Sequence, residues 1–311
     1  MQRKTTQLNQ KGDLIVYQFD MANRLLQRQY PDSLNDVFSY DAASRLTQAV
    51  SNRYQNTVSR TYNDDSTVAT EGLVTNGQNY QISHLFDSAK RNYQTTYPNG
   101  KVLSQAFTAR NQLSSVSYDA QLMANFQYDI GMRETTRGLG NGLTQTTSYR
   151  QDNLISQKSV GTITNYSYSY DANKRKTSET DGTMSSLSQT FGYDFENRLT
   201  SWSSNGTTLN QSQSWSLSLE GAWNSNIVNG VTENRAFNQT YETLSSDANL
   251  MAHDRKGNLT TNKDGSVYTW DFDNQLSFSV SGTPSVNASY AYDALGRRVS
   301  NTSNNTVTLF V

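Results

Sequence analysis

The sequence contains no cysteine, which excludes disulfide bonds and thiolate chemistry. Only three prolines and two histidines occur in 311 residues, and no apolar run is long enough to span a bilayer. The first residues, Met1-Gln2-Arg3-Lys4, are not followed by the apolar run of a signal peptide.

Hydrophobic residues make up only 34% of the chain, too few for one thick core. Disorder is disfavoured because the net charge is only −1 and 34 residues are Tyr, Phe or Trp (19, 11 and 4). An ordered, thin structure is the remaining expectation.

The dominant feature that is present is an internal repeat. Pairs in which aspartate follows an aromatic residue recur along the chain, and degenerate pairs fill the gaps between them. We call the second member of each pair the anchor. The anchors are Asp20, Asp41, Asn63, Asp87, Thr108, Asp129, Arg150, Asp171, Asp194, Ser218, Asn238, Asp254, Asp271 and Asp293. Successive anchors are 16 to 24 residues apart. The fourteen copies leave no room for another domain, so we expect residues 1–311 to form one array without a domain boundary.

Each copy reads as strand, turn, strand. Aspartate can bond the backbone two residues on and open a turn, and the Asn or Gly found three residues after the anchor in eight copies favours the left-handed conformation that closes it. A second turn is expected half a period later. Its signals are Asn76-Gly77, Asn99-Gly100, Asn141-Gly142, Asp181-Gly182, Asn205-Gly206, Asn229-Gly230 and Asp264-Gly265. The sequence therefore predicts an all-β fold with two antiparallel strands of about six to eight residues in each copy, and it shows no convincing amphipathic helix.

Aromatic residues occupy two fixed positions, one and three residues before the anchor. Positions two apart in a strand lie on the same face of a sheet, so these rings should form a ladder. The ladder residues are Tyr40, Tyr128, Tyr168, Tyr170, Tyr193, Trp270, Tyr290 and Tyr292. We expect each ring to stack on a ring of the next copy. The alternative is that exposed rings bind the faces of carbohydrates.

Arginine follows four residues after the anchor in seven copies, for example at Arg24, Arg45 and Arg175. An arginine column suggests nucleic-acid binding, but the net charge of −1 and the pI of about 6.1 lack the basic excess that such binding needs. We therefore expect each arginine to pair with an anchor aspartate or to stack on a tyrosine of the neighbouring copy.

The residues that could carry chemistry favour structural roles. Successive anchors are two strands apart, about 10 Å, which is too far for one metal site, so the anchor aspartates are expected to cap turns. His253 takes the place of an aromatic ring before its anchor, and His84 is the other histidine. The glycine-rich segment 138–142 lacks the lysine and the helix of a phosphate loop. We expect no enzyme activity, no metal and no cofactor.

The repeat resembles that of the Rhs/YD-repeat family. The segments that carry the resemblance are YDALGRR at residues 292–298, YDFENRL at 193–199 and the Tyr-Pro-Asn-Gly turn at 97–100, and the phased copies cover essentially the whole chain. The resemblance implies a spiralling ribbon of antiparallel strands that forms an open or partial hollow shell. In toxin members such a shell encloses a C-terminal toxic domain and ends with an autocleaving segment that contains Asp-Pro. Asp-Pro does not occur in this sequence, so we interpret the chain as part of a longer polypeptide.

The resemblance favours a structural shell segment of a large bacterial protein that is secreted or displayed at the cell surface. Its partners would be the remaining repeats and a C-terminal toxin or cargo of the same polypeptide. The alternative is an extracellular adhesin or filament whose repeats contact glycans, proteins or neighbouring cells. Neither hypothesis involves nucleic acid or a membrane span in this segment.

Overall fold

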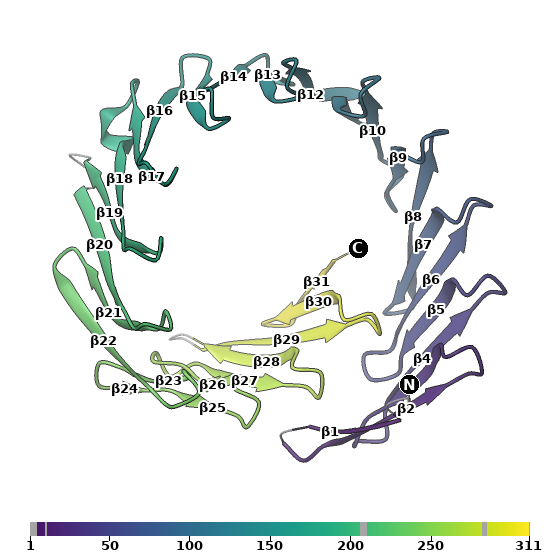
Figure 1. The fold of residues 1–311 in the computed structure, drawn as a ribbon. Helices are drawn as coiled ribbons and strands as arrows, with labels where there is room; N and C mark the ends of the chain where they lie inside the picture. The colour runs from purple at the N-terminus through teal and green to yellow at the C-terminus, as the bar shows by residue number, and fades with distance from the viewer. Residues whose placement is uncertain (1–4, 10, 206–209, 282–284, 311) are drawn as a thin grey trace. The chain divides into compact units, whose positions relative to one another are not determined.

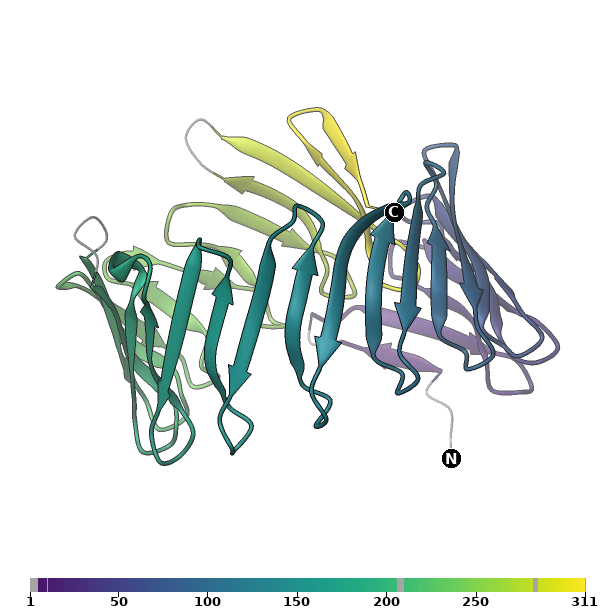
Figure 2. The same cartoon turned by 90° about the horizontal axis from the view of Figure 1, so that it is seen from above.

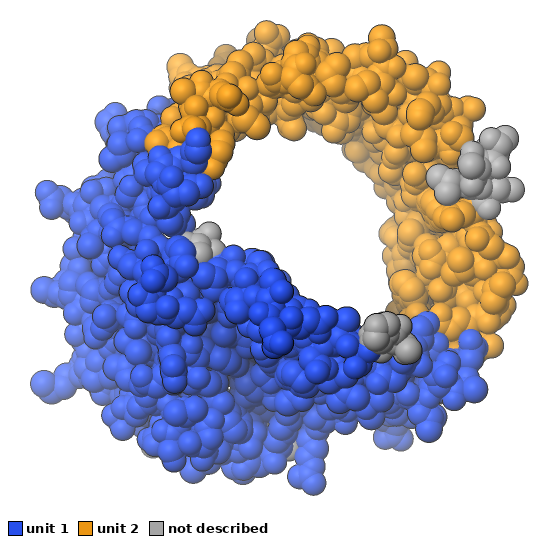
Figure 3. Space-filling model, turned by 180° about the vertical axis from the view of Figure 1, so that it is seen from behind, with its two compact units in different colours: residues 1–101, 237–311 blue, residues 102–236 orange. Residues whose placement is uncertain are grey.

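A computed structural model describes residues 5–9, 11–205, 210–281 and 285–310. The chain divides into two compact units: unit 1 comprises residues 1–101 and 237–311, and unit 2 comprises residues 102–236 (Figure 3). Antiparallel strands joined by turns make up both units (Figure 1). The described residues contain a single helical element, the 3₁₀ turn η1 (Ser185–Leu187), and no helix long and apolar enough to cross a membrane. The predicted all-β fold is confirmed.

Unit 1 is built from strands at the two ends of the chain. The early strands are β1 (Thr6–Leu8), β2 (Leu14–Phe19), β3 (Leu25–Gln29), β4 (Asn35–Tyr40), β5 (Leu46–Ser51), β6 (Asn56–Tyr62), β7 (Val68–Thr75), β8 (Gln78–Phe86) and β9 (Asn92–Thr96). The late strands are β23 (Thr243–Ser246), β24 (Asn249–Leu250), β25 (Ala252–His253), β26 (Leu259–Thr261), β27 (Val267–Trp270), β28 (Leu276–Ser281), β29 (Val286–Tyr292), β30 (Arg298–Ser303) and β31 (Thr306–Leu309). Strands β25 to β31 form a sheet of their own with seven strands.

Unit 2 is a run of hairpins whose strands lie side by side in chain order, as the teal and green strands of Figure 2 show. Its strands are β10 (Val102–Phe107), β11 (Leu113–Tyr118), β12 (Gln121–Tyr128), β13 (Glu134–Leu139), β14 (Thr144–Tyr149), β15 (Ile155–Val160), β16 (Thr164–Tyr170), β17 (Lys176–Asp181), β18 (Gln189–Tyr193), β19 (Leu199–Asn205), β20 (Asn210–Leu217), β21 (Trp223–Val228) and β22 (Val231–Phe237), whose last residue belongs to unit 1. Strands in the chain range from two residues in β24 to nine in β8, a wider spread than the predicted six to eight.

The turn at each anchor has one geometry, which we call the anchor turn (the anchor and the four residues after it). In the copy of Asp20, the amide of Asn23 donates to the carbonyl of Asp20 at 3.1 Å, and the amide of Asp20 donates to the carbonyl of Arg24 at 3.0 Å. Residue 23 has a φ of 65°, and the third residue after the anchor has a positive φ in all fourteen copies. This is a three-residue hairpin loop that ends in the left-handed conformation. The anchors therefore lie in turns, as the sequence predicts.

A β-bulge accompanies thirteen of the fourteen anchor turns, and no pattern in the sequence predicted it. In β2 and β3, Phe19 faces Leu25 while the preceding Gln18 faces Gln27, so Leu26 has no partner in the ladder. The same shift comes directly before the anchor along the chain, for example between Ser169 and Tyr170. A bulge bends and twists the pair of strands.

The second turn of each copy, which we call the half-period turn, is tight at Asn229-Gly230, where both residues have a positive φ (50° and 83°). At Asp181-Gly182 the flanking strands β17 and β18 pair antiparallel as predicted, but a longer connection joins them in place of a tight turn. The Asp181 Oδ1 accepts the amides of Thr183 at 2.8 Å and Met184 at 3.2 Å, so the chain continues into η1 before β18 begins. The predicted turn at Asn205-Gly206 lies outside the described residues.

The core of unit 1 forms where early and late strands meet. Phe38, Ala49, Val58 and Leu73 come from β4 to β7, and they cluster with Ala294 and Val299, from the anchor turn of Asp293 and from β30. Each of these six side chains is at most 8% exposed. A single layer of strands cannot bury both faces, so this contact supplies the second layer that buries them.

Candidate functional site

The anchor aspartate and the arginine four residues later form a clamp. In the copy of Asp171, Oδ1 accepts the backbone amides of Asn173 and Arg175, both at 2.9 Å. The second carboxylate oxygen, Oδ2, accepts the Nε of Arg175 at 2.6 Å. The backbone bond to the arginine is the largest cause of the lowered carboxyl pKa at Asp20, Asp41, Asp129 and Asp171. At Asp194 burial raises the pKa, and this bond is the largest of the causes that lower it. One carboxylate thus both closes the turn and fixes the guanidinium.

The clamped arginine links its copy to the next one. The Nη1 of Arg175 donates to the carbonyl of Asp194, the next anchor, at 2.7 Å. Its guanidinium lies over the ring of Tyr193, 5.0 Å from the centroid. Arg24 over Tyr40, Arg45 over Tyr62 and Arg133 over Tyr149 repeat the arrangement at 4.7 to 5.1 Å. Each of these arginines therefore both pairs with its anchor aspartate and stacks on a tyrosine, as expected. The sequence predicted that a ring would stack on a ring of the next copy, but in these copies a guanidinium stacks on the ring.

The ring before the anchor makes the return contact. The hydroxyl of Tyr193 donates to the carbonyl of Lys176 in the preceding copy at 2.8 Å. The same bond, to the fifth residue after the preceding anchor, is made by Tyr62, Tyr128, Tyr149, Tyr170, Trp270 and Tyr292. Each of these copies is therefore bonded to its predecessor by a side chain that donates to a backbone carbonyl. Because every residue type has this carbonyl, the bond tolerates substitution of the partner residue.

The predicted site residues fall into three groups. Asp20, Asp41, Asp87, Asp129, Asp171, Asp194 and Asp293 carry the arginine clamp, while Asp254 and Asp271 have Asn258 and Gln275 in its place. Tyr40, Tyr128, Tyr170, Tyr193, Trp270 and Tyr292 lie in the ladder between copies. Tyr168 and Tyr290, three residues before the anchor, make other contacts: Tyr168 stacks on Tyr166 at 6.5 Å, and the Tyr290 hydroxyl lies 3.3 Å from Ser279 Oγ.

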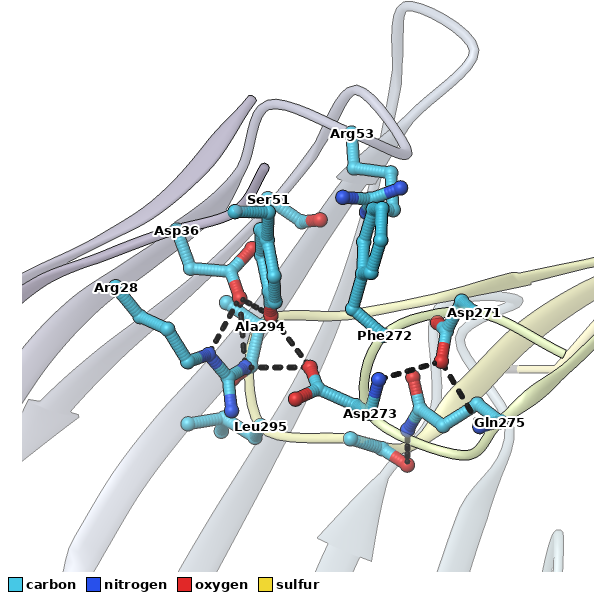
Figure 4. Close-up of polar contacts among 12 residues, drawn as sticks. Arg28, Asp36, Ser51, Arg53, Asp271, Phe272, Asp273, Gln275, Ala294 and Leu295 are labelled. Carbon is cyan, nitrogen blue, oxygen red and sulfur yellow. Dashed lines mark hydrogen bonds and ion pairs between the residues drawn. The ribbon is translucent and has the colours of Figure 1, made fainter. Parts of the chain in front are cut away.

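The late copies are joined to the early copies of unit 1 by a cluster of buried polar side chains, shown in Figure 4. We call the half-period turn that receives an anchor turn a seat. In the seat at residues 30–34, Phe272 stacks on Tyr30 with ring centroids 6.0 Å apart, and the guanidinium of Arg53 lies 4.8 Å from the Phe272 centroid. The hydroxyl of Tyr54 donates to Asp271 Oδ2 at 2.8 Å. Because Gln275 replaces the clamp arginine, this carboxylate oxygen is available to a partner 217 residues away.

Charged side chains in this seat surround Tyr30, which is 5% exposed. Its Oη lies 2.7 Å from Asp36 Oδ2 and 2.5 Å from Asp273 Oδ2. The Nη2 of Arg28 lies 2.6 Å from the same oxygen of Asp36 and 3.4 Å from that of Asp273, so one guanidinium contacts both carboxylates. Burial raises the pKa of Tyr30, and the bond to Asp273 raises it further, which keeps the hydroxyl protonated as a donor.

Two further seats flank this one, each displaced by one copy. In the seat at residues 9–13, the Nζ of Lys11 lies 2.5 Å from Asp254 Oδ2. Burial alone would raise the pKa of Asp254, but hydrogen bonds from Lys11, Asn258 and backbone amides lower it to about 2.

In the seat at residues 51–56, the Nδ2 of Asn56 donates to the carbonyl of Tyr292 at 2.9 Å, and Ala294 enters the core. Beside it, Arg297 Nη1 lies 2.5 Å from Glu71 Oε1. Three consecutive anchor turns thus occupy three consecutive half-period turns.

The polar groups at these sites are held in hydrogen bonds and ion pairs, which limits their use in binding or catalysis. The anchor carboxylates are bound to backbone amides, arginine, lysine or tyrosine, and the described residues contain no cluster of three side chains that could hold a metal ion. His84 Nδ1 lies 3.1 Å from Thr95 Oγ1, and its ring is 6.3 Å from that of Phe86. His253 ends β25 directly before its anchor. The arrangement is one of structural fastening.

The residues that form the seats were missed from the sequence. Arg28, Tyr30, Asp36, Tyr54 and Asp273 lie outside the columns that define the repeat. Tyr30 bonds Asp273 and Tyr54 bonds Asp271, in each case across more than two hundred residues. One local signal was available. Two consecutive aspartate anchors, Asp254 and Asp271, lack the arginine four residues on, and these are two of the anchors that bind early copies.

Comparisons with known proteins agree with this architecture. No protein-family model and no curated protein sequence matches the chain. Among solved structures, the crystal structure of TcdB2-TccC3 matches 97% of this chain at a TM-score of 0.80 with 14% identity. A form of TcdB2-TccC3 without its hypervariable C-terminal region (96% of this chain, 0.69, 13%) and a Photorhabdus luminescens Tc holotoxin pore (95%, 0.63, 12%) also match. This chain covers 20 to 22% of the length of those chains. The chain therefore has the fold of the Rhs/YD-repeat shells that these toxin components contain.

Proposed function

We propose that this chain is a wall segment of an Rhs/YD-repeat shell in a large bacterial protein that is secreted or displayed at the surface. The shell would enclose a C-terminal toxin or other cargo domain of the same polypeptide. The anchor aspartates and the aromatic ladder serve as fastenings between copies, and the segment catalyses no reaction.

The observation that carries the proposal is the pair of contacts that recurs from copy to copy. The clamp arginine reaches forward to the next anchor carbonyl, as Arg175 does to Asp194, and the next ring reaches back, as Tyr193 does to Lys176. Where they occur, these contacts use the anchor, its arginine and the ring before the anchor for cohesion, and they leave the polar atoms of these residues bound. A continuous, self-fastened strand layer is what a container wall requires, whereas a binding module would keep some of these groups open for a ligand.

The proposal is tested on the complete natural polypeptide that contains this segment. We expect its C-terminal cargo to resist an added protease as long as the wall is intact. A variant that loosens the seat, Tyr30→Phe with Asp273→Ala, should make the cargo sensitive at a protease concentration that leaves the parent intact. Tyr290→Phe, whose hydroxyl makes only a 3.3 Å contact, is the matched control. Cargo that is digested equally in all three proteins would contradict enclosure.

The adhesin alternative has a separate observation in its favour, the exposed rings of Phe195 (85%), Tyr241 (51%) and Trp223 (39%). Rings that stack on sugars must be accessible. Binding of the isolated chain to an array of glycans, lost in Phe195→Ser and Trp223→Ser, would favour the adhesin. The shell proposal predicts no such binding.

A further inference from the structure

We propose that the cavity between strands β7, β8, β30 and β31 of unit 1 is a fourth seat, and that it receives the anchor turn of a further YD copy. The inference rests on the proposed function, because it takes the partner to be more of the same wall.

The three occupied seats form a series. The half-period turns at 9–13, 30–34 and 51–56 hold the anchor turns of Asp254, Asp271 and Asp293, in that order. Tyr54 of the third turn also bonds Asp271. The next half-period turn is at Asn76-Gly77, between β7 and β8. A further anchor turn in the same series would lie over these two strands.

A cavity of about 490 Å³ lies at that position. Leu73 and Val299 line it and are buried, at 8% and 3% exposure. Tyr80 and Ile82 from β8 are half-buried, and Phe310 is 41% exposed. Glu71, Asp293, Arg297 and Arg298 also line the cavity, so its wall is apolar in part and charged in part. Pockets of this size that combine apolar walls with a few polar groups are typical binding sites.

Its occupant is indicated by the residue directly after the anchor, which we call the tip. In two of the three occupied seats the tip is apolar: Phe272 stacks on Tyr30, and Ala294 is 5% exposed in the core. In the third, the tip is the exposed Arg255, and Lys11 contacts the anchor Asp254 instead. In copies whose tip meets no seat among the described residues, the tip is often apolar and exposed: Met21 (98%), Ile130 (92%), Phe195 (85%) and Leu219 (78%). Exposed apolar side chains at one repeated position mark a contact surface. We therefore expect an apolar tip of a further copy to bind the apolar part of this cavity.

The absence of cysteine allows a tethering test. One thiol is introduced in the cavity by Ile82→Cys, or by Tyr80→Cys if the first variant loses the β spectrum of the parent. The matched control is Leu85→Cys, at the other face of β8 and 47% exposed. The probe is a synthetic peptide with the sequence of residues 188–204, whose tip is Phe195, and with Glu196→Cys as its thiol. Tethering raises the local concentration of the peptide, which matters because a single hairpin is only marginally stable in water.

At thiol–disulfide equilibrium we expect the peptide to load Ile82→Cys at about a tenfold lower concentration than Leu85→Cys, the ratio that 1.4 kcal/mol of non-covalent binding gives. A peptide with Phe195→Ser should lose most of this preference. Equal loading of the two protein variants, or equal loading by the two peptides, would overturn the seat. That outcome would leave the wall proposal standing, because protease protection of cargo tests the wall independently of this cavity.

Discussion

The hydroxyl oxygen of Tyr30 lies 2.5 Å from the carboxylate of Asp273, a residue 243 positions later in the chain. This bond fastens a late anchor turn to an early half-period turn and is buried among Arg28, Asp36 and Phe272. Tyr30→Phe should lower the free energy of unfolding by about 1.5–3 kcal/mol, the range for a hydrogen bond to a charged group. Denaturant unfolding measures the change, with Tyr290→Phe as the control that should cost less than about 1 kcal/mol. Equal effects of the two substitutions would mean that the seat adds no stability.

The anchor carboxylate is expected to act first through its bonds to the backbone. Asn238 is a natural anchor whose Oδ1 accepts the amides of Thr240 and Glu242, both at 2.9 Å, as Asp171 does in its own copy. Asp171→Asn should therefore lower the melting temperature less than Asp171→Ala, which loses the backbone bonds as well as the clamp. Thermal melts followed by circular dichroism compare the two. If asparagine is as damaging as alanine, the ion pair with Arg175 dominates and this interpretation of the turn is wrong.

Residues other than Asn and Gly also occupy the left-handed position of the anchor turn, and some of them are strained there. Lys174 has a φ of 65°. A non-glycine residue in this conformation costs about 1–2 kcal/mol. Glycine avoids that cost, but its larger loss of conformational entropy on folding cancels part of the gain. Lys174→Gly should raise the free energy of unfolding by about 0.5–1 kcal/mol. Ala172→Gly, in the same turn but without a positive φ, should lower the free energy of unfolding by a similar amount. If both substitutions changed the free energy of unfolding in the same direction, the turn geometry would be contradicted.

Acid should weaken the seat at residues 9–13. The pKa of Asp254 is about 2 in the folded chain against an ordinary value of 3.8. A lowered pKa means that this carboxylate stabilises the fold above pH 3.8 and that its contribution is lost as the pH falls toward 2. Lys11→Met removes one cause of the shift, so the difference in stability between parent and variant should be larger at pH 6 than at pH 2. Denaturant unfolding at the two pH values provides the test, and a difference independent of pH would contradict the assigned ion pair.

The parts of the structure that the sequence predicted are local. Asp at the anchor, Asn or Gly three residues later and Arg four residues later interact within one turn, so their spacing alone indicates the geometry that the copy of Asp194 adopts. The longer connection that replaces the tight turn at Asp181-Gly182 also has a local cause, since an aspartate that caps amides 183 and 184 can open such a connection.

The seats and the bulges could not be predicted in this way. Which early turn meets which late turn depends on how twist accumulates over many strands, and each bulge adds to that twist. The spacing of residues in the sequence does not indicate the total twist. Consequently Tyr30, Tyr54 and Asp36 look like ordinary strand or turn residues until their partners are known.

Copies are fastened both to their sequence neighbours and, in unit 1, to copies far away in the chain. Two identical substitutions separate these contacts. The Tyr62 hydroxyl bonds Leu46 in the preceding copy, whereas the Tyr54 hydroxyl bonds Asp271. Amide hydrogen exchange measured along the chain reports which segments each change loosens.

For Tyr62→Phe we expect faster exchange only near residues 40–75. For Tyr54→Phe we expect it near residue 54 and also in β26 to β28, residues 259–281, more than two hundred positions away. Exchange in Tyr54→Phe that changes only around residue 54 would contradict the account, because the late copies would then not be held by the early ones.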